Sequence, residues 1–207
     1  MPDFRELHYA DLFATPLVSF RWPDTEALNA TLAELIMAAE AAGTGELRSN
    51  VGGWHSETGA LEFCGEAGRT LVRNIYVFGD EATRRVFTAN GQPGRPARWT
   101  LRAWANVNRP GSFNRVHTHP GATWSGTYYV DPGEPSEAAG TPIHFFDPCQ
   151  GRANTFLPPQ VPSSLTIRPE PGLMILFPSY LPHMVFPHQG GRPRISIAFN
   201  LRREPFP

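Results

Sequence analysis

The sequence has 207 residues, a length typical of one domain, and we expect residues 1–207 to form a single unit. Hydrophobic residues make up 41% and charged residues 18%, with a formal net charge of -1; this excludes charge-driven disorder and argues against a nucleic-acid-binding surface. All 18 basic residues are arginine, which excludes enzymes that form a Schiff base on lysine.

Residues 1–96 carry helical signals, and we expect them to form a mostly helical layer. Asp24 or Thr25 can cap a helix whose apolar positions follow a 3.6-residue period, and Gly43 ends it. A second helix is expected from about residue 66 to residue 87, with Gly79 as a possible break.

From residue 97 to residue 207, short β-branched and aromatic segments alternate with Gly, Pro and Asn clusters, which is typical of β-sheet. The expected strands are residues 99–108, 114–119, 124–130, 143–146, 164–167, 173–177, 184–187 and 194–201. Short antiparallel strands preceded by helices predict an α+β, mainly β fold: a double-stranded β-helix, or jelly-roll, cupin-like barrel, braced by N-terminal helices. The mouth of such a barrel can hold a ligand.

The sequence favours a cytoplasmic protein with no membrane partner. Cys64 and Cys149 are too few for a disulfide framework and form no CxxC pair, so we expect two free thiols. The N-terminal residues lack an apolar run long enough for a signal peptide, and the longest strongly apolar stretch, residues 172–177, is too short to span a membrane.

His117 and His119 flank Thr118 in an expected strand. Side chains alternate across a strand, so both imidazoles point to one face, with Cα atoms roughly 7 Å apart. This spacing suits metal ligands, although paired histidines on one strand face are also common as ordinary barrel residues. A metal site therefore needs a third ligand.

The third candidate ligand is His183. Residues 189–192 predict the turn of a hairpin, which would place Arg194 and Ser196 on the same face as His183 and deeper in the barrel. A guanidinium and a hydroxyl would then lie behind the metal. This arrangement suits a dicarboxylate, because one carboxylate can chelate the ion while the guanidinium neutralises the other. The alternative is a surface arginine on an edge hairpin.

Two blocks of the sequence resemble the Fe(II)- and 2-oxoglutarate-dependent oxygenases. Residues 114–129 (NRVHTHPGATWSGTYY) resemble the N-x2-H-x-H-P-G-x3-S-G-x-Y-Y block of an uncharacterised bacterial group of these enzymes, and residues 171–200 resemble the family's second-histidine and R-x-S region. Residues 12–16 and 49–56 also look like that group. The resemblance implies a jelly-roll oxygenase with Fe(II) as cofactor and 2-oxoglutarate as cosubstrate.

The resemblance also implies roles for single residues. His117 and His183 would bind iron, and Arg194 with Ser196 would hold the distal carboxylate of 2-oxoglutarate.

Two weaker assignments concern the same cosubstrate. Tyr129 is similar to the second tyrosine of the Tyr-Tyr pair in prolyl hydroxylases, where the hydroxyl helps bind the distal carboxylate of 2-oxoglutarate. Asn106 resembles a strand asparagine that contacts the cosubstrate in nucleic-acid demethylases of the superfamily. The alternatives are a core tyrosine and an asparagine in a strand-end turn.

The sequence departs from the family at His119, because most members have a carboxylate two residues after the first histidine. The expected metal site is therefore three neutral imidazoles. Asp131 or Asp147 could supply a carboxylate, but both look like turn acids, and His144 is expected to face outward.

These residues predict an enzyme that hydroxylates an unidentified small molecule or peptide with release of succinate and CO2, with no catalytic side chain beyond the metal ligands. Trp54, Trp104 and Trp124 could line a substrate pocket, but barrel aromatics are more often core.

Two alternative functions remain open. One is a three-histidine cupin-type dioxygenase that does not use 2-oxoglutarate, against which the Arg194-x-Ser196 pair speaks; the other is a non-catalytic barrel that binds a metal or small ligand. No nucleic-acid partner is expected, and an exposed edge strand would allow a homodimer.

Overall fold

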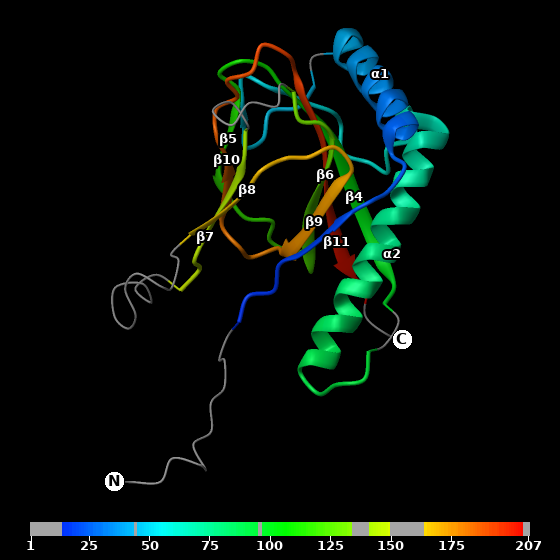
Figure 1. The fold of residues 1–207 in the computed structure, drawn as a ribbon, viewed down its shortest axis with the longest axis vertical. Helices are drawn as coiled ribbons and strands as arrows, with labels where there is room; N and C mark the ends of the chain where they lie inside the picture. The colour runs from blue at the N-terminus through cyan, green and yellow to red at the C-terminus, as the bar shows by residue number, and fades with distance from the viewer. Residues whose placement is uncertain (1–13, 44, 95–96, 134–140, 150–163, 205–207) are drawn as a thin grey trace.

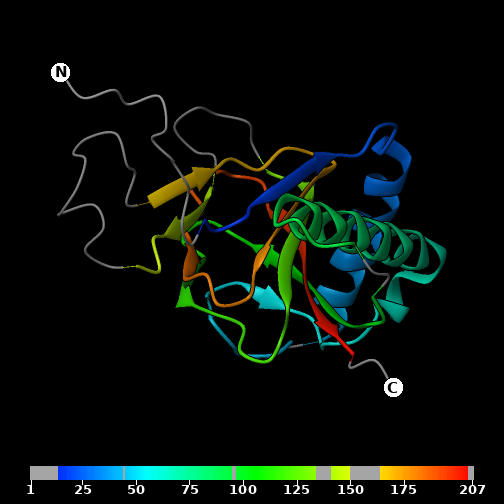
Figure 2. The same ribbon diagram turned by 90° about the horizontal axis from the view of Figure 1, so that it is seen from below.

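The computed structural model describes residues 14–43, 45–94, 97–133, 141–149 and 164–204. Two antiparallel β-sheets face each other, and both long helices lie on the outer side of one of them (Figures 1 and 2). None of the helices in the described ranges is long and apolar enough to cross a membrane.

The described residues form eleven strands, two α-helices and one short 3-10 helix. In chain order they are β1 (Val18–Arg21), α1 (Glu26–Ala42), β2 (Asn50–Val51), β3 (Trp54–His55), η1 (Glu62–Cys64), α2 (Gly65–Ala89), β4 (Trp99–Asn108), β5 (Phe113–His117), β6 (Trp124–Asp131), β7 (Ile143–Phe146), β8 (Ser164–Ile167), β9 (Leu173–Pro178), β10 (His183–Val185) and β11 (Arg194–Arg203).

The strands divide into a six-stranded sheet A, in the order β1-β9-β6-β11-β4-β3, and a five-stranded sheet B, in the order β2-β5-β10-β7-β8. From β4 to β6 and from β8 to β11 the chain alternates between the sheets, so sequential strands face each other across the interior. This is the expected mainly β, jelly-roll arrangement with helices against one sheet.

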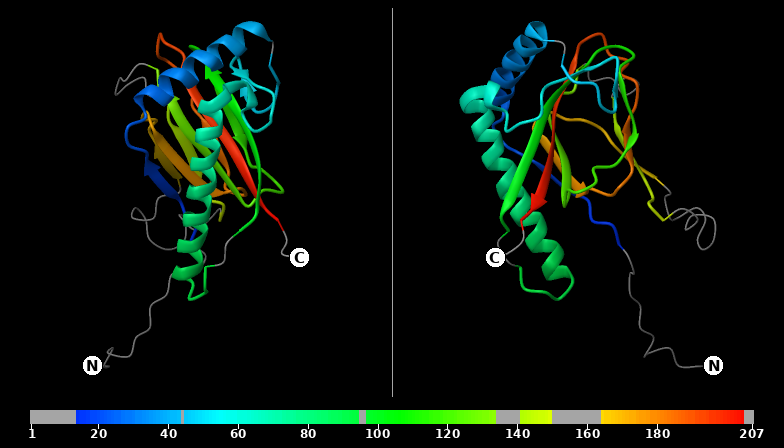
Figure 3. Two further views of the ribbon diagram at one scale, coloured as in Figure 1. Left: turned by 90° about the vertical axis from the view of Figure 1, so that its right-hand side faces the viewer. Right: turned by 180° about the vertical axis from the view of Figure 1, so that it is seen from behind.

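Both helices occupy the places that the sequence predicts. α1 ends before Gly43 and lies against the outer face of sheet A (Figure 3). Its Leu32 and Ile36 side chains are buried in the core there. α2 continues without a break through Gly79, so the possible interruption there was wrong. A Cβ at this position would lie 2.5 Å from Leu201 Cδ1, and the glycine instead lets the helix approach β11 closely.

The side chains of β4 alternate between two environments. Ala103, Ala105 and Val107 are buried beneath the helices, whereas Trp104 and Asn106 face the space between the sheets. A second apolar cluster fills part of that space; it consists of Ile143, Phe145, Ile175, Phe177, Leu181 and Val185. The remaining space is a cavity.

Three short strands in the N-terminal half, β1, β2 and β3, were not predicted. β2 and β3 have two residues each, too few to show an alternating pattern. β2 pairs with β5 and β3 pairs with β4, so the segment from residue 49 to residue 56 bridges the two sheets.

The predicted hairpin between β10 and β11 was wrong. β10 pairs with β5 and β7 in sheet B, and β11 pairs with β4 and β6 in sheet A. Residues 186–193 instead carry the chain across the interior, where His188 donates its backbone N–H to the Ser112 carbonyl. The two strands nevertheless face each other, and His183 and Arg194 line the same cavity.

Candidate metal and cosubstrate site

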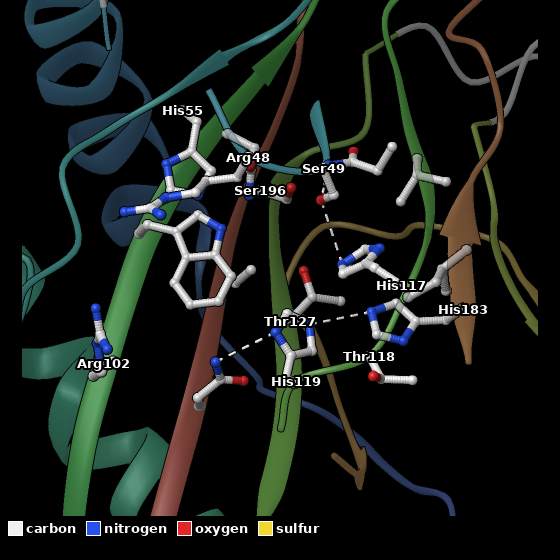
Figure 4. Close-up of a pocket in the computed structure, with 18 of the residues that line it drawn as sticks. Arg48, Ser49, His55, Arg102, His117, Thr118, His119, Thr127, His183 and Ser196 are labelled. Atoms are coloured by element: carbon white, nitrogen blue, oxygen red, sulfur yellow. Dashed lines mark hydrogen bonds between the residues drawn. The ribbon is translucent and has the colours of Figure 1, made fainter. Parts of the chain in front are cut away.

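Three histidines meet between the sheets, as the sequence predicted. His183 on β10 lies directly opposite His117 on β5, and His119 follows β5 in the turn toward β6. One ring nitrogen from each lies within 4.8 Å of the others, and the Nε2 atoms of His119 and His183 are 3.3 Å apart (Figure 4). These three side chains could hold one metal ion.

Backbone carbonyls orient two of the rings. The Nδ1 atom of His117 donates to the Arg115 carbonyl at 2.7 Å, and that of His183 donates to the Leu181 carbonyl at 2.8 Å. In the neutral tautomer that makes these bonds, each Nε2 keeps a free lone pair, which is the form of histidine that binds metals.

The cluster is neutral at physiological pH. Burial lowers the pKa of His117, and burial together with the charge of neighbouring histidines lowers the pKa of His119 to about 4 and that of His183 to about 3. Protons therefore do not compete with a metal near pH 7.

The alternative carboxylate ligands are engaged in turns. Asp131 accepts a hydrogen bond from the Gly133 N–H and pairs with Arg192, and Asp147 accepts one from the Cys149 N–H. Across the described ranges no carboxylate joins the three histidines. His144 contacts Thr166 instead of the cluster.

Two polar side chains contact the histidines. Asn200 Nδ2 lies 3.4 Å from His119 Nδ1, and Ser125 Oγ holds that amide by donating to Asn200 Oδ1 at 2.7 Å. Ser49 Oγ lies 3.4 Å from His117 Nε2. The sequence analysis did not identify Asn200 or Ser125. Asn200 could have been found, because it lies an even number of residues after Arg194 and Ser196 and therefore points to the same face of the strand.

The family-like segment at residues 49–56 contributes Ser49 and His55 to one wall of the site. The ring of His55 stacks on Trp104, with ring centres 5.4 Å apart, and Trp104 in turn lies 5.8 Å from His119. Burial lowers the pKa of His55. Residues 12 and 13 of the other family-like phrase lie outside the described residues.

Arg194 is a buried cation, only 2% exposed. Its Nη1 donates to Ser196 Oγ at 3.0 Å and to Asn108 Oδ1 at 3.3 Å, and its Nε has no partner. Burial lowers its pKa, yet a guanidinium stays charged at physiological pH. No carboxylate in the described ranges pairs with it, so the charge is available to an anion.

The cavity has a volume of about 450 Å³ and is lined by the histidines, Arg194, Ser196 and Asn106. Tyr129 lies beneath Arg194, whose guanidinium carbon is 5.2 Å from the ring centre. The Tyr129 hydroxyl is buried without a partner, and burial raises its pKa to about 12.

The three tryptophans have different roles. Trp104 is the one of the three that lines the cavity. Trp54 donates its Nε1–H to the Gly43 carbonyl, and Trp124 is buried in the core with its Nε1–H donated to Thr83.

Solved structures with similar folds include a prolyl-4-hydroxylase from Pseudomonas putida (TM-score 0.58, 19% identity, 91% of this chain and 93% of that one). A prolyl hydroxylase from Trichoplax adhaerens, in complex with a peptide fragment of the hypoxia inducible factor oxygen degradation domain, has a TM-score of 0.62 at 14% identity over 90% and 83% of the chains. The α-ketoglutarate-dependent carbocyclase SnoK from nogalamycin biosynthesis has a TM-score of 0.59 at 13% identity over 90% and 79%.

These structures share the fold of the chain at low identity. No curated protein matches it in sequence. Residues 102–200, which include the three histidines and Arg194, match the family described as "Putative 2OG-Fe(II) oxygenase". This match, the fold and the histidine cluster together make residues 102–200 similar to the 2OG-Fe(II) oxygenases, oxidoreductases whose family uses Fe(II) and 2-oxoglutarate.

Proposed function

We propose that this protein is a 2OG-Fe(II) oxygenase that hydroxylates a small molecule or peptide, binding iron through His117, His119 and His183 and 2-oxoglutarate through Arg194 and Ser196. Bound Fe(II) and 2-oxoglutarate would supply the oxidising chemistry: one atom of O2 enters a new C–OH group, and the other enters the succinate formed as 2-oxoglutarate loses CO2. The chain's own residues would bind, orient and exclude water.

The observation that carries this proposal is the buried, unpaired charge of Arg194. Isolating a charge from water costs several kcal/mol unless a partner compensates it. The free Nε of Arg194, the Ser196 hydroxyl and the unpartnered Tyr129 hydroxyl supply hydrogen bonds suited to a carboxylate. Asn106, in register with Ser196 on the adjacent strand, would contact the cosubstrate from the same face.

The three-histidine ligand set fits Fe(II) with an anionic cosubstrate. Neutral imidazoles leave both positive charges of the ion uncompensated, which favours a chelating carboxylate from 2-oxoglutarate. The ligand set alone would equally suit a dioxygenase that does not use 2-oxoglutarate, so Arg194 distinguishes the two activities.

The substrate class rests on the cavity and on the structural neighbours. A peptide is bound to the Trichoplax enzyme, and SnoK is named for a carbocyclisation, so the fold supports both kinds of substrate. We infer a cytoplasmic setting, because Cys64 and Cys149 are both free thiols.

The test is an anaerobic titration of the metal-free protein with Fe(II) and then with 2-oxoglutarate, following the visible charge-transfer band of the chelated complex. We expect the band in the wild type and at least about thirtyfold weaker 2-oxoglutarate binding in Arg194→Gln, since loss of one partner of a buried charged pair costs about 2–5 kcal/mol. Ser196→Ala gives a milder change if Arg194→Gln does not fold. The control is Arg192→Gln, an exposed arginine paired with Asp131.

Iron binding with no band in the wild type would overturn the proposal and favour the three-histidine dioxygenase. A band with equal 2-oxoglutarate affinity in wild type and Arg194→Gln would refute the role of Arg194. Succinate formed in step with O2 consumption then separates an oxygenase from a metal-binding barrel.

A further inference from the structure

A second arginine, Arg102, lines the cavity far from Arg194. β4 and β11 are paired in register, with Arg102 opposite Asn200 and Arg194 opposite Asn108. Six residues of extended strand separate the two levels, a distance of about 20 Å. Figure 4 shows Arg102 apart from Ser196, the neighbour of Arg194 on β11.

The histidine cluster faces the strands between these two arginines. His119 contacts Asn200, on the level of Arg102, and its ring lies near that of Trp104, the next inward-facing residue of β4. A molecule bound between Arg102 and the cluster would therefore lie along Trp104, away from Arg194.

The cavity is cationic. Its lining includes Arg48, Arg102 and Arg194, and no Asp or Glu from the described ranges contributes to it. Such a pocket concentrates anions. The proposed 2-oxoglutarate would neutralise Arg194, and Arg48 already pairs with Glu46 at 2.9 Å.

Arg102 differs from both of these arginines. It is exposed, and within the part of the chain that the structure describes it has neither a hydrogen-bond nor an ion-pair partner. An arginine that faces a binding cavity without a counter-ion presents its planar donors to a carboxylate from solvent.

We propose that the substrate of this oxygenase carries a carboxylate that Arg102 binds, with its apolar part along Trp104 and its reacting carbon toward the three histidines. The proposal rests on the proposed function and names the substrate class for that site. Separate cations at two ends of the cavity would keep the substrate from competing with 2-oxoglutarate. A free acid and an acidic peptide share this chemistry.

The test measures binding to the Fe(II)- and 2-oxoglutarate-loaded protein by anaerobic calorimetry. The small-molecule probes are N-acetyl-amino acids, each paired with its primary amide; the peptide probes are short capped peptides with Asp, each paired with the Asn peptide. We expect the acid of a pair to bind about tenfold to a hundredfold more tightly than the amide, as a charged hydrogen-bonded contact supplies. The two sets of probes distinguish a free acid from a peptide.

Arg102→Gln should abolish this preference for the acid and leave the 2-oxoglutarate band and its midpoint unchanged. Arg69→Gln is the control: it removes the same charge from α2, where Arg69 is exposed and paired with Glu66. If no pair shows a preference for the acid, or if Arg102→Gln keeps it, the proposal is overturned while the oxygenase assignment stands. Absence of the band in the wild type would instead overturn the proposed function.

Discussion

Tyr128 and Tyr129 are neighbours on β6 with opposite hydrogen-bonding states. The Tyr128 hydroxyl donates to Asn29 Oδ1 of α1 at 2.6 Å, whereas the Tyr129 hydroxyl, on the other face of sheet A beneath Arg194, has no partner. Both side chains are fully buried, and burial raises both pKa values to about 12. A buried hydroxyl without a partner is rare, and this one belongs to a ring that lies against Arg194, the proposed cosubstrate-binding residue.

Removing each hydroxyl should therefore have a different effect. Tyr128→Phe leaves Asn29 unpaired and should lower the free energy of unfolding by about 1–2 kcal/mol, with no change in 2-oxoglutarate binding. Tyr129→Phe breaks no existing hydrogen bond, so stability should change by less than about 0.5 kcal/mol while 2-oxoglutarate affinity falls about threefold to tenfold. Urea unfolding and the band titration measure the two quantities. Equal effects of both variants on 2-oxoglutarate would contradict a role for Tyr129.

Replacing single histidines should affect metal affinity differently inside and outside the histidine cluster. His183→Ala removes a buried, proposed ligand that the Leu181 carbonyl orients, so Co(II) or Fe(II) affinity should fall at least about tenfold. His144→Ala is the matched control on the neighbouring strand β7, where the ring bonds to Thr166 outside the cluster. Anaerobic metal titration gives both values, and unchanged affinity in His183→Ala would exclude it as a ligand.

Asn200 offers a test of how the proposed third ligand is held. Its amide lies between Ser125 Oγ and His119 Nδ1; with a metal on His119 Nε2 the ring proton is on Nδ1, so the amide would turn its oxygen to accept from that N–H. Asn200→Ala should weaken metal binding about tenfold, at the lower end of the range for residues that support a ligand. Ser125→Ala, which removes only the anchor of the amide, should have a smaller effect on the same titration. A metal affinity equal to that of wild type in Asn200→Ala would show that the ring is positioned without it.

Part of the site could be predicted from the sequence because Asn106, Arg194 and Ser196 lie on long, alternating strands, whereas His119 lies beyond the end of β5 and not in the strand expected over residues 114–119. His117, His119 and His183 were recognised from spacing and family resemblance, and all three converge. Arg194 and Ser196 were placed near His183 through a hairpin that does not exist. They line the same cavity as His183 because β10 and β11, in opposite sheets, face the same interior.

The residues that were missed lack a local pattern. β2 and β3 are two-residue strands whose existence depends on pairing with β5 and β4, far along the chain. Ser49 and His55 reach the site only through these pairings, whereas Asn200 shares the cavity-facing side of β11 with Arg194 and Ser196. Long-range register decides these positions, and periodicity within one segment carries no information about it.

Gly126 in the family-like block has a packing reason. A Cβ there would lie 2.4 Å from Phe199 Cζ and 2.5 Å from the Ile175 carbonyl oxygen. Moving backbone atoms in the centre of a sheet is energetically costly. Gly126→Ala should therefore lower the free energy of unfolding by about 1–3 kcal/mol. Gly111→Ala, where a Cβ meets no atom within 4 Å but φ is +84°, tests backbone strain without the clash. If urea unfolding shows Gly126→Ala to be neutral, the sheet has rearranged around it.

The two cysteines should differ sharply in reactivity. Cys64 is fully buried at the start of α2, and burial raises its pKa to about 11; Cys149 is exposed. Since the thiolate is the reactive form, Cys64 stays protonated and inaccessible at pH 8. Ellman's reagent should therefore modify one thiol in the folded protein and two in urea. Cys149→Ser should show no fast phase, and a fast phase in that variant would mean that the core around Cys64 opens.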